Sequence, residues 1–139
     1  MRRRPRRHTV SGMTLDANLL RRTGESFLAA LAARDFARLR GAFADDVRLR
    51  LLVPRGPQAN AGADETVGRF IGWFGGADEL RLESSHVGTV GDRLVVTYRL
   101  RVRDADRWRL LEQHLVVSAR PDGRFATVDL LCTGFHAAG

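Results

Sequence analysis

The feature that most constrains the fold is a series of three apolar-rich segments in the C-terminal half of the chain. Each segment alternates apolar with polar side chains, over residues 94–102, 110–119 and 125–135. Turn pairs precede and separate the segments: Gly91-Asp92, Ala105-Asp106 and Asp122-Gly123. Glycine beside aspartate favours a hairpin, because glycine readily adopts the positive φ that a tight turn requires. The pattern predicts a meander of long antiparallel strands.

The N-terminal half predicts three helices and one strand. Apolar residues at helical spacing indicate a helix over residues 15–33 and a short second helix after Asp35, which is a favourable N-cap. Residues 47–53 alternate as a half-exposed strand. We expect Asp64 to cap a third helix that stops at Gly75-Gly76, and residues 54–62, with Pro, Gly and Asn throughout, to form a mobile loop.

Length and composition predict one globular domain over residues 14–139, because 139 residues with 44% hydrophobic content can bury a core. No apolar run approaches the ~20 residues of a membrane span, so no membrane partner is expected. The single cysteine, Cys132, allows no internal disulfide and is typical of a cytoplasmic protein.

The net charge of +7 comes mostly from the N-terminus, where five arginines lie within the first seven residues. We interpret residues 1–13 as a disordered Arg-rich tail, which could also result from a start codon upstream of Met13. An arm that binds nucleic acid is the alternative. The remaining 18 arginines face 16 acidic residues, so a nucleic-acid partner is not expected.

Several short motifs resemble the nuclear-transport-factor-2-like superfamily and its SnoaL-like domains. The motifs are Phe27-Leu-Ala-Ala-Leu-Ala-Ala-Arg-Asp35, Phe43-Ala-Asp-Asp-Val47, Gly91-Asp-Arg-Leu-Val-Val96, Asp122-Gly-Arg-Phe125 and Leu131-Cys-Thr-Gly-Phe135. The last motif is similar to an uncharacterised bacterial branch. The resemblance covers about residues 15–135 and implies an α+β fold, in which a cone-like curved antiparallel sheet packs against three N-terminal helices. It also implies a pocket for a small apolar molecule.

Two-residue turns fix which residues face each other across the meander. Tyr98 is predicted to face Gln113, and Gln113 to face Cys132, on the apolar and therefore buried side of the sheet. The opposite side carries Arg99, Glu112, His114 and Asp129, together with the apolar residues Trp108, Leu110, Val116 and Leu131. An exposed apolar patch usually marks an interface, so we expect a homodimer through this outer face.

The direction of His86 is less constrained. Hydrophobicity places Leu80, Leu82 and His86 on the inside, whereas a strict turn at Gly91-Asp92 places the other parity there. A bulge would reconcile the two patterns. We expect His86 to face the interior.

The catalytic hypothesis assigns proton transfer to His86, whose ordinary pKa lies near neutral pH. Tyr98 would donate to a developing oxyanion and Gln113 would orient a carbonyl. Phe27, Trp73, Leu115 and Cys132 would complete the ligand pocket. Each of these residues could instead be purely structural. The scattered histidines indicate no metal site, and no cofactor is expected.

The enzymes of the superfamily provide a comparison position by position. Ketosteroid isomerases use a tyrosine, a base and a protonated aspartate where this chain has Phe27, Leu51 and Leu115. SnoaL-type polyketide cyclases use an aspartate near Cys132. Limonene-epoxide-hydrolase-like members need an Asp-Arg-Asp cluster, for which Arg81 or Arg99 with Asp129 could serve only after a register shift. Each comparison therefore weighs against the corresponding mechanism, and the enzyme hypothesis stays open.

Two functions remain open at this stage. The first is a cofactor-free cyclase, isomerase or dehydratase that acts on a small polyketide- or terpenoid-like substrate. The second is a non-catalytic module that binds an apolar ligand or dimerises, and the missing carboxylates favour it.

Overall fold

The computed structural model describes residues 16–138, so the predicted tail over residues 1–13 lies outside the described residues. The helices are α2 (Ala17–Ala33), α3 (Phe36–Gly41) and α4 (Ala63–Phe74). The strands are β1 (Phe43–Val53), β2 (Gly56–Ala61), β3 (Glu79–Val90), β4 (Arg93–Asp104), β5 (Arg107–Ala119), β6 (Phe125–Cys132) and β7 (His136–Ala137). No helix within these residues is long and apolar enough to cross a membrane.

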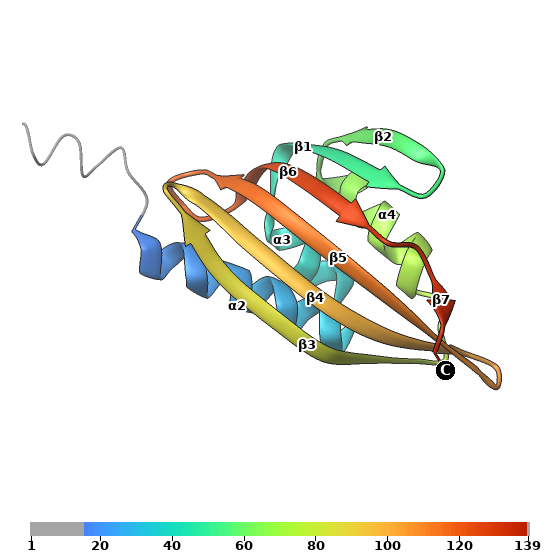
Figure 1. Ribbon diagram of the computed structural model, residues 1–139. Helices are drawn as coiled ribbons and strands as arrows, with labels where there is room; N and C mark the ends of the chain where they lie inside the picture. The colour runs from blue at the N-terminus through green and yellow to red at the C-terminus, as the bar shows by residue number, and fades with distance from the viewer. Residues whose placement is uncertain (1–15, 139) are drawn as a thin grey trace, which may run out of the picture.

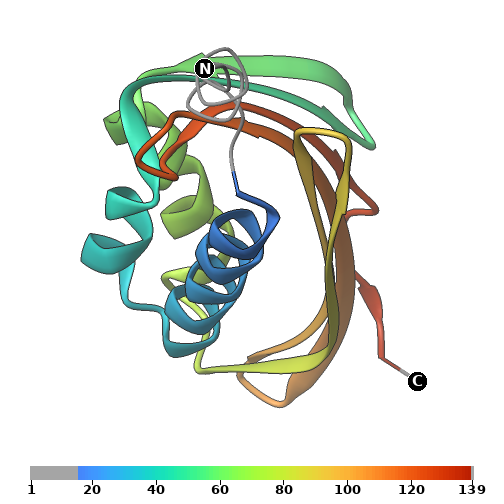
Figure 2. The same cartoon turned by 90° about the vertical axis from the view of Figure 1, so that its left-hand side faces the viewer.

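The strands form one curved sheet in the order β2-β1-β6-β5-β4-β3, with β7 paired to β5. The helices lie on its concave side, as the predicted α+β cone requires (Figures 1 and 2). The sheet is mixed and not wholly antiparallel, because β1 and β6 run parallel. This pairing joins two distant segments of the chain, and no hairpin signal in the sequence reports it.

The predicted register of the meander is confirmed. Tyr98 pairs with Gln113 between β4 and β5, and Gln113 pairs with Cys132 between β5 and β6. The turn at Ala105, which has a φ of 54°, and the turn at Gly123, with a φ of 92°, lie where the sequence predicted them. The turn chemistry thus determined which side chains share a face.

The helix ends are partly as predicted. Asp35 caps α3, since its carboxylate accepts from the Arg38 backbone N–H at 3.1 Å. For α4 the predicted cap is wrong: the N-cap is Gly62, with a φ of 90°, and Asp64 lies in the first turn. There Asp64 faces α3 and accepts from Arg40 Nε at 2.7 Å.

Residues 54–62 are not a mobile loop, contrary to the sequence-based expectation. Residues Gly56–Ala61 form the edge strand β2, which pairs with β1 from Arg48↔Ala61 to Val53↔Gly56. An edge strand has one free side, so Pro57 is tolerated without loss of a ladder bond. Arg69 of α4 holds the strand by donating to Asn60 Oδ1 at 3.0 Å and to Gln58 Oε1 at 2.5 Å.

The space between helices and sheet is filled by aromatic rings. Phe27 of α2 lies at the centre, with its ring centroid 5.7–6.2 Å from those of four other rings. These rings belong to Phe43, Phe70, Tyr98 and Phe125. Gly24 lets α2 approach the sheet closely, because a Cβ there would lie 2.9 Å from Val87 Cγ1.

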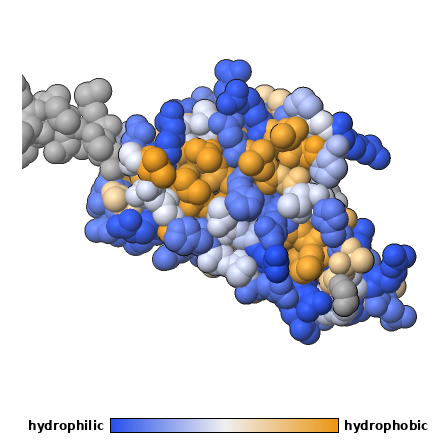
Figure 3. Space-filling model, in the orientation of Figure 1, coloured by the Kyte–Doolittle hydropathy of each residue, from blue (hydrophilic) through white to orange (hydrophobic). Residues whose placement is uncertain are grey.

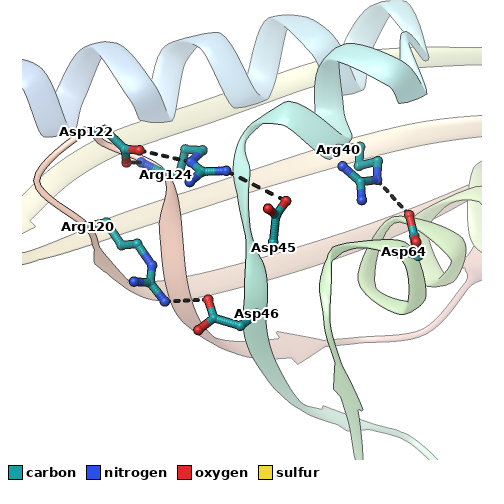
Figure 4. Close-up of polar contacts among 7 residues, drawn as sticks. All are labelled: Arg40, Asp45, Asp46, Asp64, Arg120, Asp122 and Arg124. Carbon is teal, nitrogen blue, oxygen red and sulfur yellow. Dashed lines mark hydrogen bonds and ion pairs between the residues drawn. The ribbon is translucent and has the colours of Figure 1, made fainter.

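Exposed ion pairs join the start of β1 to the β5–β6 turn (Figure 4). Arg120 donates to Asp46, and Arg124 lies 3.8 Å from Asp45 and 3.0 Å from Asp122. Exposed pairs of this kind contribute about 0–1 kcal/mol each. They support the parallel β1–β6 contact without being its main source of stability.

Candidate functional site

The inner face of the sheet brings together three of the predicted polar residues. The Tyr98 hydroxyl donates to Gln113 Oε1 across the β4–β5 pair. Gln113 Nε2 in turn donates to Cys132 Sγ at 3.4 Å, and the Gly134 backbone N–H donates to the same sulfur at 3.4 Å. The side chains form a short relay in which the Tyr98 and Gln113 groups are already partnered.

Burial dominates the electrostatics of this relay. Tyr98 is 3% exposed and Gln113 is 0% exposed. Desolvation raises the pKa of Tyr98 well above its ordinary value, with a smaller contribution from Cys132. A phenol in this environment stays protonated at neutral pH, so it acts as a hydrogen-bond donor and not as a base.

Three of the predicted pocket residues are fully buried beside the relay. Phe27, Gln113 and Leu115 have no solvent-accessible surface. A cavity large enough for one water molecule would leave accessible surface on the side chains that line it. No water-sized hollow therefore borders the side chains of Phe27, Gln113 and Leu115.

The other two predicted pocket residues, Trp73 and Cys132, lie at the border of the buried core. Trp73 of α4 is partly exposed and packs on Phe70 and Phe74, with centroid distances of 5.3 and 5.9 Å. Cys132 is also partly exposed, at the end of β6.

The prediction that His86 faces the interior is wrong. A bulge at Glu83 shifts the register of β3, so that Leu82 pairs with Leu100 but Ser84 pairs with Arg99. The bulge itself was anticipated, and it keeps Leu80 and Leu82 inside while it turns the later residues over. His86 pairs with Thr97 on the outer face and is exposed.

His86 borders a small outer hollow of about 310 Å³ that is shared with Glu112 and His114. His114 Nε2 lies 3.8 Å from Glu112 Oε1. Glu112 also accepts from Arg99 Nε at 2.9 Å, and this hydrogen bond is the main reason why the Glu112 pKa lies below its ordinary value. Arg99 and Glu112 thus form the surface pair that the register predicted.

No Asp, Glu or His within residues 16–138 is fully buried. In the same range no three His, Cys, Asp or Glu side chains lie close enough to hold a metal ion. The interior thus offers a buried phenol, an amide and a thiol for chemistry, but no carboxylate or imidazole that could serve as a general base.

An open apolar surface lies on the outer face, which Figure 3 shows with orange patches over β1, β6 and β5. A groove of about 820 Å³ runs there between β2 and β5. Leu52, Val116 and Leu131 border it and remain 49%, 44% and 54% exposed. We call this surface the outer groove.

Charged groups cross the floor of the outer groove. Arg50 of β1 makes two hydrogen bonds to Asp129 of β6, at 2.7 and 3.1 Å. The alternation of side chains in the sequence predicted that Val116 and Leu131 point to the outer face. The wall formed by Pro57, Gln58 and Ala59 was not, because β2 had been interpreted as a loop.

Trp108 and Leu110 do not join the outer groove. Three guanidiniums surround the Trp108 ring, those of Arg81, Arg101 and Arg103, at 4.8–5.9 Å from its centroid. The predicted apolar patch is therefore divided, and a polar strip with Glu112 and His114 lies between its two parts.

Comparison with known proteins agrees with this architecture. The SnoaL-like domain family matches residues 25–132. The chain belongs to the SnoaL-like domain family. A search of curated proteins found no match for this SnoaL-like chain.

Solved structures share the fold of this SnoaL-like protein at low sequence identity. An epoxide hydrolase of the LEH-like type from M. tuberculosis is 19% identical, with a TM-score of 0.65 and 84% of each chain covered. A candidate ketosteroid isomerase from Kribbella flavida is 19% identical, with a TM-score of 0.67, and the match covers 91% of this chain and 86% of that one. A candidate polyketide cyclase from Xanthomonas campestris is 14% identical, with a TM-score of 0.66 and coverage of 83% and 90%. These likenesses establish the fold and not an activity.

Proposed function

We propose that this SnoaL-like chain is a non-catalytic module that pairs with a second copy of itself through the outer groove. One observation carries the proposal: three large aliphatic side chains, Leu52, Val116 and Leu131, stay about half exposed around one groove. Complete burial of such a side chain contributes about 1.5–3 kcal/mol. Covering this surface in an association is therefore favourable.

A second copy is the partner that the charges favour. Closed two-fold pairs bring the same surface patch of both copies together. The outer groove carries one cation and one anion side by side, Arg50 and Asp129. Around a two-fold axis such a pair can meet its own copy in the opposite sense, so that unlike charges face each other. The free thiol of Cys132 fits a cytoplasmic location for this pair.

The alternative is a cyclase, isomerase or dehydratase that acts on a small polyketide- or terpenoid-like substrate. That reading required His86 inside a pocket together with Tyr98 and Gln113. His86 is instead on the outer face, and the two interior residues bond to each other. The neighbours that carry enzyme names support the family and the fold. We therefore favour the non-catalytic reading for this chain.

The test is the oligomeric state in solution, measured by sedimentation velocity on the full chain. Wild type should sediment as a dimer, and Val116→Arg or Leu131→Arg should give monomers, because a charge would enter the apolar contact. Ile71→Arg is the matched control: Ile71 is 43% exposed, close to the 44% of Val116, but it lies on α4, on the other side of the sheet. A monomeric wild type, or dimers in both groove variants, would refute the proposal.

A further inference from the structure

Residues 133–138 form a short segment that folds back along β5. After β6 the backbone turns at Gly134, and β7 pairs with Arg109 and Leu110. Besides the β5–β7 pairing, Thr133 N–H donates to the Glu112 carbonyl at 3.0 Å, Ala138 N–H donates to the Trp108 carbonyl at 3.1 Å, and Thr133 Oγ1 accepts from the Glu112 N–H at 3.0 Å. We call residues 133–138 the C-terminal strap.

The strap places an aromatic ring at the end of the interior next to α4. Phe135 is partly buried and meets the Phe74 ring edge-on, with a centroid distance of 6.4 Å and an interplanar angle of 76°. The Arg109 guanidinium lies 4.6 Å from the centroid of the same ring. The Phe135 ring thus has an aromatic neighbour and a cation, the two kinds of contact that favour an aromatic guest.

Phe135 is also the outermost ring in a continuous series. From Phe135 the ring contacts pass to Phe74, Phe70, Phe27 and finally Tyr98, with centroid distances between 5.9 and 6.4 Å. Cys132, which precedes the strap, accepts from both Gln113 and Gly134. The strap is therefore in contact with the interior relay and not merely with the surface.

The strap is attached weakly compared with the rest of the sheet. β7 has two residues, whereas its neighbour β5 has thirteen. Gly134 has a φ of 76°, and a Cβ on it would lie 2.7 Å from Pro54 Cγ, so the turn depends on a glycine. Segments held by few backbone bonds open at a small fraction of the global unfolding free energy.

We propose that the C-terminal strap is a gate and that Phe135 is its tethered plug, which occupies a site for a monocyclic aromatic ligand bounded by Phe74 and Arg109. A neutral or anionic ring fits this site, because the Arg109 cation faces the ring; a cationic ring would be repelled. Displacement of the Phe135 ring opens this site to a guest. The inference goes beyond the pairing proposed above and does not depend on it.

The first test uses wild-type full-length protein and hydrogen exchange measured by mass spectrometry, with phenol as the probe. Phenol should displace the plug and accelerate exchange in peptides over residues 133–138 by about tenfold or more, in a saturable way. Benzylamine, which carries a positive charge, should not. Unchanged exchange at saturating phenol, or equal effects of both probes, would overturn the gate.

The second test removes the plug. Phe135→Ala should bind phenol at least about tenfold more tightly than wild type, because the ligand no longer competes with the tethered ring. Phe36→Ala, which removes a partly buried ring from α3, is the control and should gain nothing. If Phe135→Ala does not fold, Phe135→Leu keeps an apolar contact with a smaller side chain and should show a smaller gain. No gain in the folded variant would overturn the ring site.

Discussion

Replacing Tyr98 by phenylalanine should destabilise the protein although it removes only one oxygen atom. The Tyr98 hydroxyl donates to Gln113 Oε1, and Gln113 is completely buried. Without that donor the amide oxygen has no partner, and no water can reach it. An unsatisfied buried polar group costs about 1–3 kcal/mol. For a chain of 139 residues, each kcal/mol lowers the melting temperature by about 3–5 °C.

The double mutant separates a structural pair from two independent contacts. Gln113→Leu alone leaves the Tyr98 hydroxyl without an acceptor and should cost a similar amount. Cys132 then loses the Gln113 donor, which adds little because sulfur is a weak acceptor. Tyr98→Phe combined with Gln113→Leu removes both polar groups, so its cost should be smaller than the sum by about 0.5–3 kcal/mol.

Urea unfolding followed by circular dichroism measures the free energy of unfolding for all four proteins of this cycle. Ser118→Ala is the control: Ser118 bonds to Thr127 near the surface, where water can replace the lost partner, so the change should stay within about 0.5 kcal/mol. Costs that simply add, or a Tyr98→Phe variant as stable as wild type, would show that the two groups do not form the sealed pair described above.

Two further predictions concern the turns. Gly134→Ala should destabilise the protein more than Gly91→Ala. Both glycines have positive φ values, 76° and 60°, but only at Gly134 would the new Cβ meet another atom, Pro54 Cγ at 2.7 Å. Thermal unfolding compares the two variants, and equal losses of stability would contradict the contact with Pro54. The pKa of Asp122 is lowered, first by the hydrogen bond from the backbone N–H of Arg124 and then by the guanidinium of the same residue. The ionised carboxylate therefore stabilises the protein above its ordinary pKa of 3.8, and this stability is lost as the pH falls through the pKa of Asp122 in the folded state. Asp122→Asn should therefore flatten the acid dependence of the unfolding free energy below about pH 4, and an unchanged profile in urea titrations would count against this assignment.

The sequence predicted the meander with its register because local chemistry determines both. Glycine and aspartate at the turns fix the number of residues in each hairpin, and a one-residue slip would bury Arg99 and Arg101. The Tyr98–Gln113–Cys132 row follows directly from these constraints. The helix cap at Asp35 is similarly local.

The features that were missed depend on contacts between distant segments. The bulge at Glu83 reverses the facing of His86, and its position between Leu82 and Ser84 is not fixed by parity alone. β2 lacks apolar alternation and exists because it pairs with β1 and is held by Arg69. How tightly the interior is packed depends on how four rings meet around Phe27, and that is a property of the whole core.

The Tyr98 hydroxyl of this SnoaL-like protein is buried with Gln113 and closed to water in the folded state. Tyr98 is the single tyrosine of the chain, so ultraviolet absorbance reports its ionisation without interference from another phenol. Burial raises its pKa, so the stability linked to the neutral phenol is present below pH 10 and is lost as the pH rises through the folded value. In an alkaline titration followed by absorbance and circular dichroism together, tyrosinate should form only as the protein unfolds. Reversible ionisation near pH 10 in protein that is still folded would show that water reaches the hydroxyl, and it would contradict the account.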